Sequence, residues 1–289
     1  MTCNRLADLP PPPPDALRVG FLGDIVGKSG RGLALAQVEP LHEAGVAFLV
    51  ANVENASGGN GVTAREAKEL LAGGIDVLTT GNHVWRHKDL IPLLEHEPRV
   101  LRPANYPAGT PGIGHGRFPL PNGGSILVVS LLGRTFLEPV DCPFRTMDRI
   151  LAEAGGTGPV WPPAPDVPAG GPLRTPCLVD FHAEATAEKH TLRFHLDGRV
   201  TALVGTHTHV QTSDAEVSAL GTGYLTDAGM CAAYPSVIGF EPQSVLARFR
   251  TLLPHRYVPA EGPGRVEGVV FDVDPATGRC LAVASIRVA

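Results

Sequence analysis

The fold of this chain is organised around the stretch Leu203-Val204-Gly205-Thr206-His207-Thr208-His209-Val210-Gln211. The apolar run at 201–204 predicts a short buried strand, and the glycine lets the backbone turn sharply at its end. Two imidazoles follow at positions i and i+2. Because the chain is leaving the sheet there, the pair can aim two nitrogens around one cavity. Neutral imidazole is the commonest ligand of first-row metals, so the stretch favours a metal site over two polar loop histidines.

Composition limits the function classes. The 289 residues are enough for one large α/β domain. A net charge of −5 without a polybasic face argues against a stable nucleic-acid complex. No segment has the apolar length of a membrane span, and no signal-peptide pattern opens the chain. The five cysteines are scattered without a C-x-x-C pair, which is typical of reduced thiols. These features predict a cytoplasmic protein with no membrane partner.

Polar residues follow the predicted strands of the first third. Apolar runs predict buried strands at 17–24, 46–51 and 75–80, with helices at 33–44 and 63–72 between them. The residues at or just past the strand ends are Asp24, Glu54, Asn55, Asn82 and His83. In open α/β sheets of this βαβαβ pattern, the carboxyl edge is where ligands bind.

The rest of the chain continues the pattern. Further strands are predicted at 125–132, 177–182 and 224–227, helices at 87–94, 185–196 and 242–252, and two or three antiparallel strands within 256–289. His182 ends the strand at 177–182. The Gly- and Pro-rich segment 155–176 predicts a long surface loop or flap. The polyproline run at 10–14 predicts that residues 1–16 form a flexible extension that does not pack into a core, with a single domain at 17–289.

The strand-end residues form a set of two carboxylates, two amides and three or four imidazoles, without a thiolate. Such a set suits Fe, Mn or Zn better than Ca²⁺ or a structural zinc. It holds enough ligands for two metals bridged by a carboxylate such as Glu54, an arrangement that clamps a phosphoryl group for in-line attack. Each residue has a simpler alternative: Asp24 as a turn cap, Asn55 and Asn82 as Asx turns, His182 as a core histidine. Their convergence on one sheet edge favours the metal site.

A series of motifs occurs in order along nearly all of the chain from residue 17. They are Gly-Asp-Ile-Val-Gly at 23–27, Glu-Asn-Ala at 54–56, Thr-Gly-Asn-His-Val-Trp at 80–85, Arg-Pro-Ala-Asn-Tyr-Pro at 102–107, Asp-Phe-His-Ala-Glu-Ala-Thr at 180–186 and Gly-Thr-His-Thr-His-Val-Gln-Thr at 205–212. This set resembles the YmdB-like family of bacterial metallophosphoesterases, within the calcineurin-like superfamily. The superfamily usually opens with Asp-x-His, whereas Val26 stands here, which matches the narrower family, where Asn55 replaces the missing histidine.

The resemblance implies an α/β fold, the calcineurin-like sandwich of mixed β-sheets flanked by helices (αββα). It implies a phosphodiesterase acting on small cyclic nucleotides, notably 2′,3′-cyclic AMP, through a dinuclear centre that is usually iron, with manganese as the alternative. One metal would be held by Asp24, Asn55 and His209, and the other by Asn82, His182 and His207, with Glu54 bridging. His83 would be the general acid that protonates the leaving alkoxide. The resemblance also implies a homo-oligomer.

Two other functions compete with this expectation. A phosphomonoesterase such as a nucleotidase would use the same ligand set. A regulatory protein could bind a nucleotide with only incidental turnover, and the acidic, compact chain is compatible with that role. Side-by-side assays of monoesters and diesters separate the first from the diesterase, and complementation by a His83→Ala protein separates the second.

Overall fold

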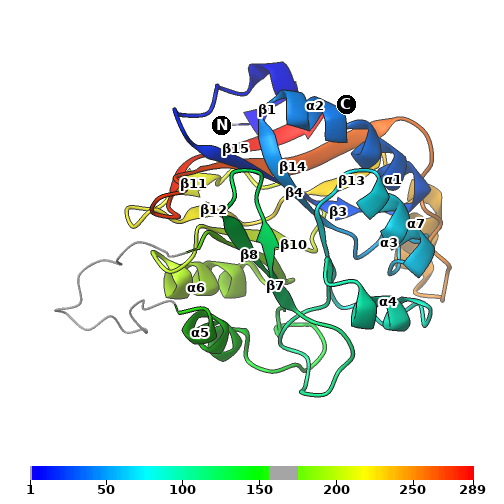
Figure 1. The fold of residues 1–289 in the computed structure, drawn as a ribbon. Coiled ribbons are helices and arrows are strands. Elements are labelled where there is room, and N and C mark those ends of the chain that lie inside the picture. Colours follow the sequence, from blue (N-terminus) through cyan, green and yellow to red (C-terminus); the bar gives the residue numbers. More distant parts are fainter. Residues whose placement is uncertain (1, 156–174) are drawn as a thin grey trace.

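The computed structural model describes residues 2–155 and 175–289 and shows two β-sheets packed face to face, with helices on both outer sides (Figure 1). The first sheet runs in the order β1 (Thr2–Cys3), β15 (Cys280–Val288), β14 (Gly264–Val273), β2 (Leu17–Leu22), β4 (Val46–Asn52), β5 (Val77–Thr79) and β6 (Val100–Leu101). Two short strands extend it, β13 (Met230–Ala233), which pairs with β14, and β3 (Asp24–Ile25), which pairs with β13.

The second sheet contains the strand that ends at His182 and the strand that ends directly before His207. Its order is β11 (Glu216–Val217), β12 (Gly223–Leu225), β10 (Ala202–Thr206), β9 (Cys177–His182), β8 (Ser125–Leu132) and β7 (His115–Pro119). Strands β8, β9, β10 and β12 are parallel, and the register pairs Thr206 with His182. The carboxyl ends of β9 and β10 therefore deliver their polar residues side by side.

Three apolar layers hold the sandwich together. Between the sheets, side chains of β2, β4 and β14 such as Phe21 and Phe271 pack with side chains of β8 to β10 such as Val204. Outside the first sheet lie α1 (Gly27–Ala36), α2 (Val38–Glu43), α3 (Ala64–Ala72) and α4 (Leu90–His96). Outside the second lie α5 (Pro143–Glu153) and α6 (Thr186–Leu196). Burial of both faces explains why the strands read as continuous apolar runs, and the αββα prediction is confirmed.

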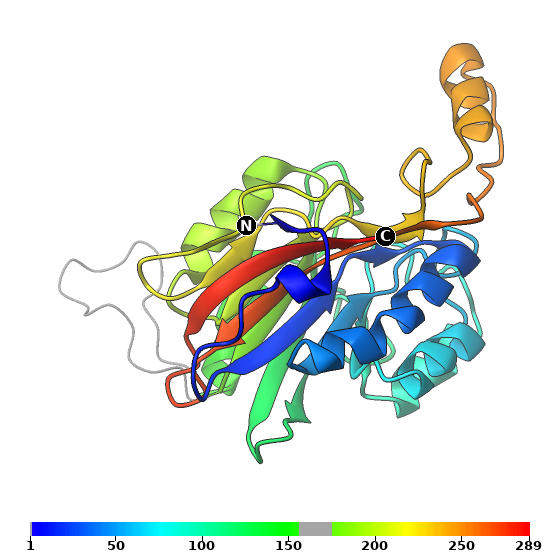
Figure 2. The ribbon, with the colours of Figure 1, turned by 90° about the horizontal axis from the view of Figure 1, so that it is seen from above.

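Some element boundaries differ from the sequence prediction. The helix expected at 33–44 is two helices, and α1 begins earlier, within the glycine run. A Cβ on Gly30 would lie 2.2 Å from the backbone oxygen of Cys231, so the glycine allows α1 to pack tightly on β13. The tail forms two long strands, β14 and β15, and β13 was not predicted. A seventh helix, α7 (Pro242–Thr251), stands on an arm that projects from the body (Figure 2).

The N-terminal segment is packed against the domain. Strand β1 pairs in parallel with β15, Cys3 is buried, and Leu6 and Leu9 contact the layer outside the first sheet. The guanidinium of Arg18 donates to the carbonyl oxygen of Pro10 at 2.7 Å. The prediction of an unpacked extension is therefore wrong for residues 2–10, because apolar side chains before the polyproline run pack on the domain and the backbone of Pro10 accepts a hydrogen bond from it. A flap was predicted at 155–176. Residues 156–174 of this range lie outside the part of the chain that the structure describes.

No helix within residues 2–155 and 175–289 combines the length and hydropathy required to cross a membrane.

Candidate metal centre

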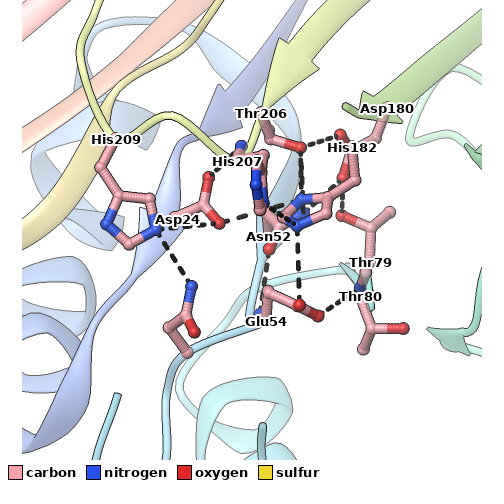
Figure 3. A network of polar contacts seen from close by, with 12 residues as sticks. Asp24, Asn52, Glu54, Thr79, Thr80, Asp180, His182, Thr206, His207 and His209 are labelled. Atoms are coloured by element: carbon pink, nitrogen blue, oxygen red, sulfur yellow. Dashed lines mark hydrogen bonds and ion pairs between the residues drawn. The ribbon is translucent and has the colours of Figure 1, made fainter. Parts of the chain in front are cut away.

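Most of the predicted ligands meet where β3 begins and where β4, β9 and β10 end (Figure 3). The Nε2 atom of His209 lies 3.6 Å from Asp24 Oδ1 and 3.0 Å from Asn55 Nδ2. The Nε2 atom of His182 lies 3.5 Å from Glu54 Oε1. The five side chains are almost completely buried. The side chains that the sequence singled out therefore do cluster, but they come from two sheets and not from the edge of a single sheet.

His207 and His83 also belong to the cluster, and Asn82 directly precedes His83 in the chain. The Nδ1 atom of His207 lies 3.0 Å from His182 Nε2. His83 joins through its backbone N–H, which donates to Glu54 at 2.7 Å, and through Nδ1, 3.0 Å from Asn55 Oδ1. The Oδ1 atom of Asn82 is buried without a hydrogen-bond partner among the described residues.

The backbone of Gly81 lies against the His182 ring. Its N–H donates to Glu54 at 2.5 Å, and a Cβ at this position would lie 2.2 Å from His182 Cδ2. Glycine is therefore required for the loop after β5 to approach both the carboxylate and the imidazole.

The His-x-His turn is conformationally strained. His207 and His209 both have positive φ, 100° and 62°. Non-glycine residues in this region cost about 1–3 kcal/mol each and persist only where the surroundings enforce them. The Asp24 carboxylate accepts the His207 N–H at 3.0 Å, which ties the turn to the opposite sheet.

A buried ion pair holds the same turn from behind. Lys189, on α6, donates to the Thr206 backbone oxygen and to Asp227 Oδ2, both at 2.8 Å. The same Asp227 oxygen accepts the backbone N–H and the hydroxyl of Thr208. Neither charged residue was predicted as part of the site. The sequence does show a lysine within a predicted helix and an aspartate just after a predicted strand. Nothing in the sequence links these two residues to residues 206–208.

Hydrogen bonds orient each imidazole. His182 Nδ1 lies 2.9 Å from the Thr206 hydroxyl, which itself donates to Asp180 at 2.7 Å, so His182 carries its proton on Nδ1 and presents the Nε2 lone pair to the site. His209 Nδ1 lies 2.9 Å from the carbonyl oxygen of Ile238, which leaves Nε2 free in the same way. Outer partners of this kind fix the tautomer of metal-binding histidines. The sequence signal for Asp180 was a carboxylate inside an otherwise apolar strand.

Burial sets the charge states. It disfavours ionisation of Asp24, but the adjacent His209 outweighs it and lowers the pKa of Asp24, while that carboxylate raises the pKa of His209. Burial, together with the neighbouring Asp24 charge, raises the pKa of Glu54 well above its ordinary range. Burial lowers the pKa values of His182 and His207.

The donor set fits cations. Among the described residues, Asp24 Oδ1 and Asn82 Oδ1 are buried without hydrogen-bond partners, which is costly unless another group contacts them. His207 Nε2 lies 3.0 Å from a Glu184 oxygen, so its proton lies there, and its Nδ1 lone pair then faces that of His182. Two lone pairs that face each other repel, and a cation between the two nitrogen atoms would remove this repulsion. In the described part of the chain, no three His, Cys, Asp or Glu side chains are already spaced around a single point as in a metal-loaded site.

Metal loading is expected to release protons and to tighten as pH rises. Asp24 is already ionised and His182 already neutral near pH 7, because of the directions of their pKa shifts. Glu54 has a pKa raised well above its ordinary range and holds a proton that a cation must displace, and the raised pKa of His209 adds to the pH dependence of loading. Calorimetric titration of Mn²⁺ into metal-free protein, in two buffers of different ionisation enthalpy, counts these protons. Glu54→Gln should release fewer, and an equal count would contradict the assignment.

The cluster opens into a pocket of about 970 Å³. Asn55, His83, His207 and His209 are among its lining residues, together with the aromatic side chains of Phe240 and Tyr257. The size is in the range of small-molecule sites. A ligand in the pocket would therefore contact the polar cluster directly.

The fold and this site define an enzyme of the metallophosphoesterase class. The family model for YmdB-like proteins matches residues 21–286, and the chain belongs to this family. It is 39% identical over 274 residues to the 2′,3′-cyclic-nucleotide 2′-phosphodiesterase of Bacillus subtilis, an alignment that covers 94% of this chain and 97% of the relative.

Two solved structures have the same fold. A hypothetical protein from Thermus thermophilus superposes with a TM-score of 0.82 at 38% identity, covering 94% of this chain and 98% of that one. A protein of Mycoplasma pneumoniae described as a novel phosphatase also has a TM-score of 0.82, at 27% identity, with coverage of 94% and 93%. The resemblance inferred from the motifs is confirmed.

Proposed function

We propose that this protein hydrolyses small phosphodiesters, with 2′,3′-cyclic nucleotides as substrates, at a dinuclear metal centre. The observation that carries the proposal is the buried cluster of carboxylate, amide and imidazole groups that opens into a nucleotide-sized pocket. The name of the Bacillus subtilis relative supports the substrate class. The proposal includes a cytoplasmic location and self-association, as the sequence predicted.

Asp24, Asn55 and His209 would hold one ion, and Asn82, His182 and His207 the other. Glu54, which precedes Asn55 in the chain and lies 3.5 Å from His182 through Oε1, would bridge them. Two first-row ions, iron or alternatively manganese, would neutralise the phosphoryl group and lower the pKa of an attacking water. The Asn55 amide presents Nδ2 to His209 and Oδ1 to His83. Ligation through its oxygen on the His209 side therefore requires the amide to turn over.

His83 would act on the leaving group. It lines the pocket beside the cluster, and its Nδ1 contacts Asn55, which leaves Nε2 for a ligand. Burial, reinforced by Arg86, lowers the pKa of His83 to about 4. A phosphate anion in the pocket raises that pKa, since a nearby negative charge favours the protonated imidazole. His83 would thus gain its proton with substrate and donate it to the departing alkoxide.

His83→Ala is expected to lower kcat on 2′,3′-cyclic AMP by about 10²–10⁴, the usual contribution of a general acid, while the metal content stays at the native value. Steady-state kinetics and elemental analysis on the same preparation check both. His87→Ala is the matched control, because His87 lines the same pocket but its Nε2 contacts the backbone oxygen of Asn60. Native turnover by the His83 variant would show that His83 is not the general acid.

A phosphomonoesterase activity is the second candidate, supported by the description of the Mycoplasma pneumoniae structure as a phosphatase. Assays of 2′,3′-cyclic AMP and of the adenosine monophosphates on one metal-loaded sample separate the two. Faster release of phosphate from the monoesters would favour the phosphatase.

A further inference from the structure

The outer part of the pocket is positively charged, although the chain as a whole is acidic. The protein has 29 Asp and Glu against 24 Lys and Arg. Three arginines nevertheless line the pocket, Arg86, Arg248 and Arg256. Among the described residues that line it, one acidic side chain is present, Glu184. Glu184 already contacts His207 at 3.0 Å. The pocket therefore has an excess of positive charge that the described residues do not neutralise.

The three arginines are not engaged by acidic side chains of the described chain. Among the ion pairs of residues 2–155 and 175–289, none involves Arg86, Arg248 or Arg256. Arg248 instead contacts an aromatic ring, its guanidinium carbon lying 5.9 Å from the centroid of Tyr257. Guanidinium groups that line one pocket without carboxylate partners of their own are suited to phosphate oxygens, which they bind through paired N–H donors.

The arm that carries two of them is anchored at its base. Phe240 packs on Gly59, where a Cβ would lie 2.5 Å from the Phe240 ring, and it forms a β-bridge with Pro259. The N–H of Glu241 donates to the Val258 oxygen at 2.8 Å. These contacts close the arm at both ends, so Arg248 and Arg256 are held over the pocket although α7 itself projects from the body (Figure 2).

A simple 2′,3′-cyclic nucleotide does not use this charge. Its only phosphate is the scissile diester, which the ligand cluster would receive. The ribose of a nucleoside has three hydroxyl groups, and the cyclic diester occupies two of them. A second phosphate on the same nucleoside must therefore be attached at the 5′ oxygen.

We infer that Arg248 and Arg256, with Arg86, form a subsite for a phosphate on the 5′ side of the nucleoside. This inference rests on the proposed function. The preferred substrates are then 2′,3′-cyclic nucleotides that also carry a 5′-phosphate group. That chemistry has two sources, a 5′-phosphorylated mononucleotide and the last nucleotide of a short RNA that ends in a cyclic phosphate.

The test compares three substrates on the metal-loaded full chain: adenosine 2′,3′-cyclic phosphate, its 5′-monophosphate derivative, and the dinucleotide ApA with a terminal 2′,3′-cyclic phosphate. Charge-assisted contacts of this kind predict a kcat/KM about tenfold higher for a 5′-phosphorylated substrate than for the simple one, mainly through a lower KM. The gain should shrink with added salt, because exposed charges are screened. A gain confined to the monoester identifies mononucleotides as the source, and a gain with ApA identifies RNA ends.

The double variant Arg248→Gln/Arg256→Gln should bring the ratio of the two kcat/KM values close to one. Arg250→Gln is the matched control, because Arg250 is exposed on α7 but does not line the pocket, and it should keep the native ratio. Equal kcat/KM values for all three substrates on the native protein, or an unchanged ratio in the double variant, would overturn the subsite. Absence of turnover of the simple cyclic nucleotide would instead overturn the proposed function.

Discussion

Asp24→Asn is expected to lower kcat/KM on 2′,3′-cyclic AMP by about 10³-fold or more and to reduce the bound metal, since a metal centre supplies several kcal/mol of charge stabilisation. Asp24 is fully buried, and its Oδ1 lies 3.6 Å from His209 Nε2 without a hydrogen bond from the described residues. The amide keeps the shape of the side chain but removes the negative charge that attracts a cation.

Elemental analysis and steady-state kinetics on the same preparation measure this effect. Asp274→Asn is the control, because Asp274 caps a surface turn through Thr277 and Ala276 and is remote from the cluster. It should retain native metal content and rate. Native metal content and turnover in the Asp24 variant would show that this carboxylate is not a ligand.

Lys189→Met is expected to lower the free energy of unfolding by about 3–5 kcal/mol, because removing one partner of a buried ion pair leaves the other charge uncompensated. Both side chains of the Lys189–Asp227 pair are almost completely buried, with exposed fractions of 2% and 1%. The lysine also donates to the Thr206 oxygen directly before His207, so the variant should bind metal less tightly as well.

Urea unfolding with and without Mn²⁺ measures both effects. The double variant Lys189→Met/Asp227→Asn removes both charges and should recover part of the lost stability. Lys68→Met replaces an exposed lysine on α3 and should change stability by less than about 0.5 kcal/mol. A Lys189 variant as stable as the Lys68 variant would contradict the role of the buried pair.

The sequence was informative where the chemistry is local. The continuous apolar runs predicted the parallel strands because both faces of each sheet are covered. The residues after those runs were expected at the edge of one sheet, whereas they come together from strands of two sheets. The His-x-His pair, Glu54 and Asn55 could be identified as site candidates without knowledge of the tertiary contacts, because ligands bind at the strand ends of an α/β fold.

The supporting contacts were not predictable from the sequence because they join distant segments. Lys189 meets residues 206 and 227, and Asp180 is bound by Thr79 and Asn52 from the opposite sheet. The polyproline run indicated an unpacked N-terminus, but Cys3 is buried because β15 offers it an open sheet edge. Local composition cannot show which edge will be available.

The measurement that tests the account most directly is elemental analysis of the purified protein, combined with hydrolysis of 2′,3′-cyclic AMP by the same sample. We expect about two first-row metal ions per chain, the number that a bridged two-ion site holds, and turnover that is lost on chelation and restored by Mn²⁺ or Fe²⁺. Full turnover by metal-free protein, or no turnover after both ions are added, would contradict the central claim.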